Sequence, residues 1–205
     1  MKVKICGIQT TEAALNAVEN GADALGFVFA RSKRQITKLE ARNIVAVLPD
    51  SVWKVGVFVN TNVAEIKQIA ETAGLTHIQL HGDENPADYR LLRLPLIKAV
   101  SVTSPEDLKK LDDIEADYLL LDSPPAQFQG GNGSTFEWEL AKAIGKSKTN
   151  IILAGGLDPG NISKASAMVN PFMVDVSSGV ESNGEKDYEK IKDFINNAKD
   201  QREEV

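Results

Sequence analysis

The sequence has 205 residues, of which 42% are hydrophobic and 25% charged, and its formal net charge is −6. This composition is typical of a globular protein that buries one substantial core. The acidic balance lacks the basic face that nucleic-acid binding requires, so we expect no nucleic acid among the partners.

The cysteine content and the N-terminal residues narrow the class of protein further. Cys6 is the single cysteine, which excludes an intrachain disulfide and the usual zinc-ligand spacings. The first residues, MKVKICG, lack the apolar segment of a signal peptide, and no apolar run approaches the length of a membrane span. We therefore expect a cytoplasmic protein with no metal site and no membrane partner.

Eight short apolar segments, rich in β-branched residues, recur along the chain. They are typical of buried parallel strands, which are hydrophobic almost throughout instead of alternating. The segments are residues 3–5, 24–29, 53–59, 77–80, 96–100, 118–121, 150–153 and 172–176.

Segments with helical periodicity separate these strands, and most begin at a recognisable capping residue. The predicted starts are Thr10 or Thr11, Thr37 with Glu40, Asn62, Ser104-Pro105, Asp158-Pro159 and Asp187. Alternating strands and helices occur in closed parallel barrels and in doubly wound sheets. The even spacing of the strands favours a single (β/α)8 barrel over residues 1–205, with a frayed tail at 200–205.

In such a barrel, functional residues lie where strands end and the following loops begin. Two glycine-rich turns follow the seventh and eighth predicted strands. Gly155 and Gly156 belong to the first turn, and Ser177, Ser178 and Gly179 to the second. Glycines let backbone N–H groups converge on a phosphate, and barrel phosphate sites recur at these two loops. The turns are thus predicted to bind phosphate; alternatively, they are only tight turns.

Cys6 and Asp122 end the first and sixth predicted strands, which would place both at the mouth of the barrel. Lys4 shares a strand face with Cys6, so its ammonium group is expected to lower the thiol pKa and create a usable base. Asp122 follows four apolar residues, and partial burial would favour its protonated, proton-donating form. Cys6 could instead be a small buried hydrophobe. The long loop at 124–136 is a candidate lid.

Three further positions are candidate site residues. Arg34 follows the second strand and could bind a substrate carboxylate in a bidentate manner, whereas Arg31 and Lys33 are expected to be solvated. His81 ends the fourth strand and is either a site residue or a structural one. Asp175, at the start of the second glycine-rich turn, is also a candidate.

Seven segments, in chain order, resemble the successive signatures of the phosphoribosylanthranilate isomerase family. They are VKICG (3–7), GFVF (26–29) with SKR (32–34), VGVF (55–58), QLHG (79–82), LLD (120–122) with GG (130–131), AGGL (154–157) and DVSSGVE (175–181). The resemblance spans nearly the whole chain, and KICG together with DVSSGVE is especially specific. Lys33, Asn132 and Glu137 depart from the family pattern, which leaves open the behaviour of the lid and the fine placement of Arg34.

The resemblance implies an Amadori rearrangement of N-(5-phosphoribosyl)anthranilate in tryptophan biosynthesis, without a cofactor. It implies that Asp122 is the general acid that opens the furanose ring and that Cys6 is the general base that removes the C2 proton. Arg34 would hold the anthranilate carboxylate, and the glycine-rich turns would hold the phosphate of this small-molecule substrate. The sequence leaves open whether the protein is a monomer or a homodimer.

Four alternatives are weighed against this assignment. A sugar-phosphate epimerase would need metal ligands or paired aspartates, and an indole-glycerol-phosphate synthase would need catalytic Lys and Glu residues, for which Lys98 is the only obvious candidate. A bifunctional isomerase would be expected to have an aspartate at position 6. A non-catalytic metabolite-binding barrel would keep the phosphate turns but would have no need for both Cys6 and Asp122.

Overall fold

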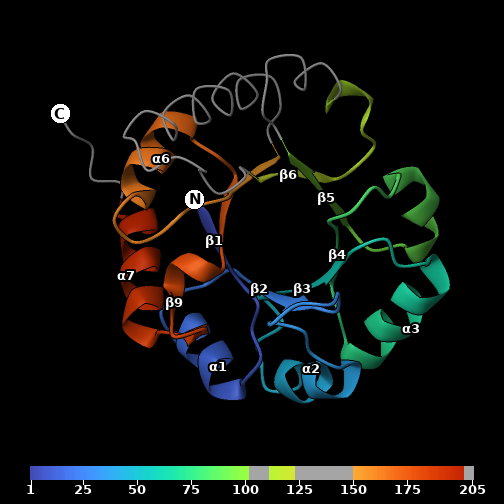
Figure 1. Ribbon diagram of the computed structural model, residues 1–205, viewed down its shortest axis with the longest axis horizontal. Helices are drawn as coiled ribbons and strands as arrows, with labels where there is room; N and C mark the ends of the chain where they lie inside the picture. Colours follow the sequence, from blue (N-terminus) through green and yellow to red (C-terminus); the bar gives the residue numbers. More distant parts are fainter. Residues whose placement is uncertain (102–110, 123–149, 201–205) are drawn as a thin grey trace.

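The chain forms a closed barrel of eight parallel strands with helices packed around it (Figure 1). The computed structural model describes residues 1–101, 111–122 and 150–200. The strands are β1 (Lys2–Cys6), β2 (Ala24–Val28), β3 (Trp53–Phe58), β4 (His77–Leu80), β5 (Leu96–Ser101), β6 (Tyr118–Asp122), β7 (Ile151–Ala154) and β8 (Met173–Val176). Because β8 pairs with β1, the barrel is closed, and the predicted (β/α)8 fold is confirmed over a doubly wound sheet.

The α-helices of the described segments begin close to their predicted starts. They are α1 (Thr11–Glu19), α2 (Lys38–Val45), α3 (Val63–Ala73), α6 (Ile162–Val169) and α7 (Tyr188–Lys199). Thr10, and not Thr11, caps α1, and Thr37 with Glu40 forms the predicted capping box. These local side-chain bonds satisfy N–H groups that a helix start leaves without a partner.

One predicted helix start is wrong in its detail, and other elements were not predicted. Asp158 does not cap α6; it accepts hydrogen bonds from the N–H groups of Gly160 and Asn161 in the preceding turn. The 3-10 helices are η1 (Pro86–Leu92), η2 (Leu111–Asp113) and η3 (Ser178–Val180), and β9 (Glu181–Ser182) pairs with β10 (Glu185–Lys186). The predicted start at residues 104–105, the loop at 124–136 and tail residues 201–205 lie outside the described segments.

Two apolar layers hold the barrel together. The larger lies between the strands and the surrounding helices and includes the buried side chains of Phe27, Phe58 and Phe194. The smaller layer fills the barrel interior with side chains from alternate strand positions. Val55 on β3 and Ile97 on β5 belong to it. In the described segments no helix is long and apolar enough to cross a membrane.

Aromatic rings close the N-terminal end of the barrel. Trp53 stacks on His77 with ring centroids 3.9 Å apart, and Tyr118 and Phe172 pack beside Trp53. With this end filled by rings, the opposite end, where the strands finish, is left for a pocket. Burial lowers the pKa of His77 from 6.5 to about 4.

This buried imidazole should make the stability of the barrel depend on pH. Between pH 6.5 and about 4 the unfolded chain binds more protons at His77 than the folded chain. The contribution of neutral His77 to the free energy of unfolding is therefore complete above pH 6.5. It is lost as pH falls towards 4, which lowers the free energy of unfolding by roughly 2 kcal/mol after allowance for partial solvent screening. His77→Phe, which keeps the stacking on Trp53, should flatten this part of the profile. Urea unfolding followed by tryptophan fluorescence at pH 7 and pH 4.5 measures it; equal pH dependence in both proteins would contradict the assignment.

Candidate functional site

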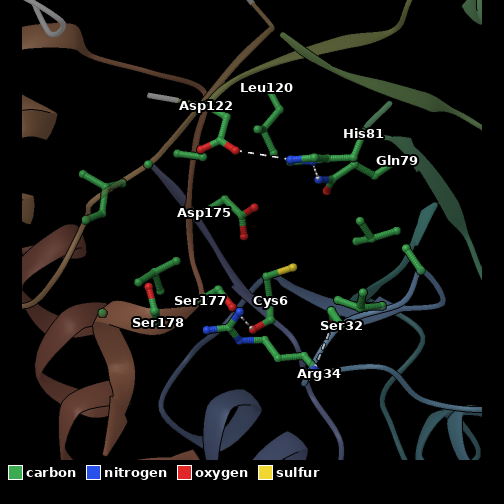
Figure 2. Close-up of a pocket in the computed structure, with 18 of the residues that line it drawn as sticks. Cys6, Ser32, Arg34, Gln79, His81, Leu120, Asp122, Asp175, Ser177 and Ser178 are labelled. Atoms are coloured by element: carbon green, nitrogen blue, oxygen red, sulfur yellow. Dashed lines mark hydrogen bonds and ion pairs between the residues drawn. The ribbon is translucent and has the colours of Figure 1, made fainter. Parts of the chain in front are cut away.

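A pocket of about 430 Å³ opens at the C-terminal ends of the strands (Figure 2). All the site residues predicted from the sequence line it: Cys6, Arg34, His81, Asp122, Gly155, Gly156, Asp175, Ser177, Ser178 and Gly179. These residues are far apart in the chain, and the barrel brings them together because each lies at or just after a strand end.

Cys6 occupies the pocket floor at the end of β1. Gly26 lies beside it on β2, and a Cβ atom added to Gly26 would come within 2.7 Å of the Cys6 sulfur. Glycine at this position therefore leaves the space that the thiol fills. The Ser177 hydroxyl donates a hydrogen bond to the Cys6 carbonyl oxygen over 3.1 Å, which ties the β8 turn to β1.

Lys4 lies below Cys6 on the same face of β1, fully buried inside the barrel. Its Nζ atom is 2.8 Å from Oδ2 of Asp175 on β8, while Asp175 Oδ1 is buried without a hydrogen-bond partner in the described structure. Burial opposes the charge of Lys4, but the Asp175 carboxylate and the Cys6 sulfur outweigh it and raise the pKa of the ammonium group. Lys4 is therefore a fixed positive charge beneath the thiol.

The predicted lowering of the Cys6 pKa is wrong, because the net shift is upward even though Lys4 itself acts to lower it. Burial is the largest influence and raises the pKa of the thiol above its ordinary value of 9.0. Lys4 and Lys186 do favour the thiolate, as the sequence suggested for Lys4, but the Asp175 carboxylate opposes them. Burial and the Asp175 carboxylate together outweigh the two ammonium groups, so the thiol form predominates at neutral pH.

Arg34 reaches the pocket from the loop after β2 and is held by Glu181. Its Nε and Nη2 atoms lie 2.6 Å and 2.8 Å from the two Glu181 carboxylate oxygens. Burial alone would raise the pKa of Glu181, but hydrogen bonds from Arg34 and Lys186 lower it to about 2. Gly7 permits this path, because a Cβ there would lie 2.5 Å from Cδ of Arg34. The guanidinium group is thus held in a fixed orientation at the pocket by two hydrogen bonds to Glu181.

Of the two neighbouring basic residues predicted to be solvated, Lys33 agrees with the prediction and Arg31 agrees only in part. The Lys33 side chain is 63% exposed, as expected for a solvated residue, although its Nζ atom lies 3.7 Å from Oε2 of Glu181. Arg31 is exposed but also lines the pocket, so it is not merely a solvated loop residue.

Asp122 lies at the end of β6, across the pocket from Cys6, and is paired with His81 (Figure 2). Its Oδ2 atom is 3.2 Å from His81 Nε2, and the other ring nitrogen of His81 is 3.0 Å from Nε2 of Gln79. The Asp122 side chain is 39% exposed, so it is less desolvated than the preceding apolar run suggested. The environment of this carboxyl group is therefore set by its contact with the His81 imidazole as well as by partial burial.

The two glycine-rich turns meet at one side of the pocket. Gly155 and Gly156 follow β7 with φ values of 83° and 62°, which strongly favour glycine. A Cβ added to Gly179 would lie 1.9 Å from the Leu157 carbonyl oxygen. The turns after β7 and β8 therefore approach each other as closely as their backbones allow, and only glycine fits at the contact.

Sequence reasoning missed three residues that shape this site: Gln79, Glu181 and Lys186. Gln79 lies two residues before His81, so the alternation of strand side chains could have placed both inside the barrel. Glu181 and Lys186 belong to the β9–β10 hairpin, where Lys186 also donates to the Ser177 carbonyl oxygen over 2.9 Å. No strand or helix pattern in the sequence indicated this hairpin.

The electrostatics of Cys6 can be measured directly because it is the single cysteine of the chain. We expect the iodoacetamide alkylation rate of the folded protein to rise with pH, with a midpoint above 9. Lys4→Met should move the midpoint higher and Asp175→Asn should move it lower, because the two charges act in opposite directions. Circular dichroism would verify folding, and one shared midpoint in all three proteins would refute the coupling.

Comparison with known proteins agrees with this geometry. A family model for N-(5'phosphoribosyl)anthranilate (PRA) isomerase matches residues 3–197. The N-(5'-phosphoribosyl)anthranilate isomerase of a Bacillus cereus strain is 55% identical over 199 residues, which cover 97% of this chain and 98% of the relative.

Solved structures give the same result in three dimensions. Phosphoribosyl anthranilate isomerase from Thermotoga maritima superposes with a TM-score of 0.89 at 44% identity, over 97% of this chain and 98% of that one. A second structure of such an enzyme holds reduced 1-(o-carboxyphenylamino)-1-deoxyribulose 5-phosphate; it has a TM-score of 0.86 at 42% identity, with the same coverage. The resemblance found in the sequence is confirmed: the chain belongs to the N-(5'-phosphoribosyl)anthranilate isomerase family.

Proposed function

We propose that this protein converts N-(5'-phosphoribosyl)anthranilate to 1-(2-carboxyphenylamino)-1-deoxyribulose 5-phosphate in tryptophan biosynthesis. Membership of the isomerase family supports the reaction. The observation that carries the residue roles is the placement of Cys6 and Asp122 on opposite sides of one pocket. A substrate that spans this pocket meets a proton donor on one side and a proton acceptor on the other.

The phosphate end of the substrate binds at the turns after β7 and β8. Gly155, Gly156, Ser178 and Gly179 bring backbone N–H groups to the pocket wall, and glycine gives a phosphate the close approach it needs. Ser177 contributes through its backbone, because its hydroxyl hydrogen is already donated to Cys6. Phosphate binding at this end fixes the direction in which the rest of the substrate lies.

The anthranilate end binds at Arg34. Glu181 occupies two of the guanidinium nitrogens and holds the group in place, while Nη1 remains to meet the anthranilate carboxylate. Asp175 lines the pocket between these two ends, and its buried Oδ1 has no hydrogen-bond partner among the described residues. That oxygen accepts a hydrogen bond from the substrate amine or a ribose hydroxyl, since a buried acceptor without a partner is costly.

The first chemical step opens the ring. Asp122 transfers a proton to the furanose oxygen, the C1–O bond breaks, and the nitrogen lone pair forms the C1=N bond of a protonated Schiff base. The proton moves from carboxyl group to sugar, and Asp122 is left as a carboxylate beside His81. Charge and atoms balance without a metal or an organic cofactor.

The second step moves a proton from C2. The Cys6 thiolate takes it, the C2–H electron pair forms the C1=C2 bond, and the C=N electrons return to nitrogen to give an enolamine. Tautomerisation of the enolamine gives the ketone. Burial raises the Cys6 pKa, so the thiolate is scarce at neutral pH but is a strong base once formed. The rate of this step should therefore increase as pH rises above neutrality.

Turnover can be followed by the loss of fluorescence of phosphoribosylanthranilate generated in the assay. We expect rapid turnover by the wild type and losses of roughly 10²–10⁴-fold in kcat for Cys6→Ser and for Asp122→Asn, because each removes one proton-transfer group. Circular dichroism should show both variants folded. Asp50→Asn, an exposed residue away from the pocket, is the matched control and should retain full activity.

The outcome that would contradict the function is a folded wild-type protein that binds phosphate without converting the substrate. A non-catalytic metabolite-binding barrel would then be the better assignment. Full activity in either Cys6→Ser or Asp122→Asn would keep the reaction but refute the role of that residue.

The phosphate site gives a separate prediction. Gly179→Ala would force the β8 turn away from Leu157 and withdraw at least one hydrogen bond from the phosphate. A hydrogen bond to a charged group is worth about 1.5–3 kcal/mol, so KM should rise about ten- to a hundredfold. The inhibition constant of inorganic phosphate should rise in parallel. Gly160→Ala is the control, because this exposed glycine does not line the pocket, its φ is not in the left-handed region, and the added Cβ would come no closer than 3.2 Å to another atom, Oδ1 of Asp158. Equal phosphate inhibition in wild type and Gly179→Ala would contradict the site.

A further inference from the structure

We propose that Gln79 is a positioning residue that fixes the tautomer of His81 and thereby leaves one defined oxygen of Asp122 to carry the acidic proton. The inference rests on the proposed function, which makes Asp122 the general acid. It concerns Gln79 and His81, which the proton transfers described above do not use.

The geometry is a chain of three side chains from two strands. Gln79 points into the barrel from β4 and is 2% exposed. Its Nε2 atom lies 3.0 Å from Nδ1 of His81, whose Nε2 atom lies 3.2 Å from Oδ2 of Asp122 on β6. Figure 2 shows the three side chains in a row along one wall of the pocket, with Cys6 on the other side. Among the described residues, the imidazole of His81 connects the Gln79 amide to the Asp122 carboxyl group.

The direction of the first hydrogen bond follows from the other end of the amide. Gln79 Oε1 is buried and has no hydrogen-bond partner within the described segments. If the amide were turned over, its two N–H donors would occupy that position and both would lack an acceptor. A buried N–H group without a partner is rarer in proteins than an under-satisfied carbonyl oxygen. The amide therefore donates an N–H to Nδ1, and Nδ1 must be the ring nitrogen without a proton.

With Nδ1 unprotonated, the proton of the neutral ring lies on Nε2 and faces Oδ2 of Asp122. Oδ2 is then an acceptor, and the remaining oxygen, Oδ1, carries the acidic proton towards the substrate. After the transfer, the same imidazole N–H faces the new carboxylate and stabilises it. The other charged groups around this pair in the described pocket are Asp175, Arg31 and Arg34, together with the Cys6 thiol.

The tautomer can be observed without any turnover. The chain has two histidines, so ¹⁵N NMR of the imidazole nitrogens gives two sets of signals, and His77→Phe assigns them. In the neutral form of the wild-type His81 ring, we expect the proton on Nε2. Gln79→Glu, which has the same shape, presents only acceptors and should move the proton to Nδ1. Gln79→Met, which has neither donor nor strong acceptor, should remove the preference.

Activity gives the second readout. Both variants should lower kcat by roughly tenfold or more, and Gln79→Glu should have the lower kcat of the two, while KM changes little. This loss of kcat is smaller than the 10²–10⁴-fold expected for loss of the general acid itself. Gln68→Glu, on the exposed face of α3, is the control for the added charge and should leave kcat unchanged.

Three outcomes would overturn the inference: wild-type His81 protonated on Nδ1, the same tautomer in wild type and Gln79→Glu, or a raised KM with unchanged kcat. The last would make Gln79 a substrate contact instead. A wild-type protein without turnover would overturn the proposed function and with it the acid role. A wrong tautomer in an active enzyme would overturn this inference alone.

Discussion

The buried ion pair between Lys4 and Asp175 is the interaction on which the rest of the site depends. It joins β1 to β8, residues 171 positions apart, at the seam where the barrel closes. Both side chains are buried, so loss of either partner would leave an unpaired buried charge at a cost of about 3–5 kcal/mol. The pair also places opposite charges below the Cys6 thiol, and it holds the Asp175 side chain at the pocket lining. The same ion pair thus joins the first and last strands of the barrel and sets the charges around Cys6, the proposed base.

A second set of charges organises the mouth of the pocket. Glu181 accepts hydrogen bonds from both Arg34 and Lys186, and Lys186 also binds the carbonyl oxygen of Ser177. One short hairpin after β8 therefore fixes the arginine proposed to bind the anthranilate carboxylate and the turn proposed to hold phosphate. The two ends of the substrate would be held by a single connected network, which is how distances within a pocket are kept constant.

The proposed base and acid differ in environment. Cys6 is buried among charged side chains, and its pKa is raised chiefly because the thiolate is desolvated. Asp122 is more exposed and is in contact with His81, which Gln79 holds from behind. A base that is strong when formed and an acid whose conjugate carboxylate is stabilised by an imidazole suit two successive proton transfers in opposite directions.

The sequence alone predicts the order of strands and helices, most of the described helix starts and the places of the candidate site residues at strand ends. These are local properties: the apolar runs, the capping side chains and the turn glycines act within a few residues of one another. The folded barrel is needed to show that Asp175 faces Lys4, that Glu181 binds Arg34 and that His81 contacts Asp122. Those partners come from different strands, and the sign of the Cys6 pKa shift depends on all of them at once. Burial and charge in a pocket are sums over neighbours that the closing of the barrel brings together, and no stretch of sequence contains that sum.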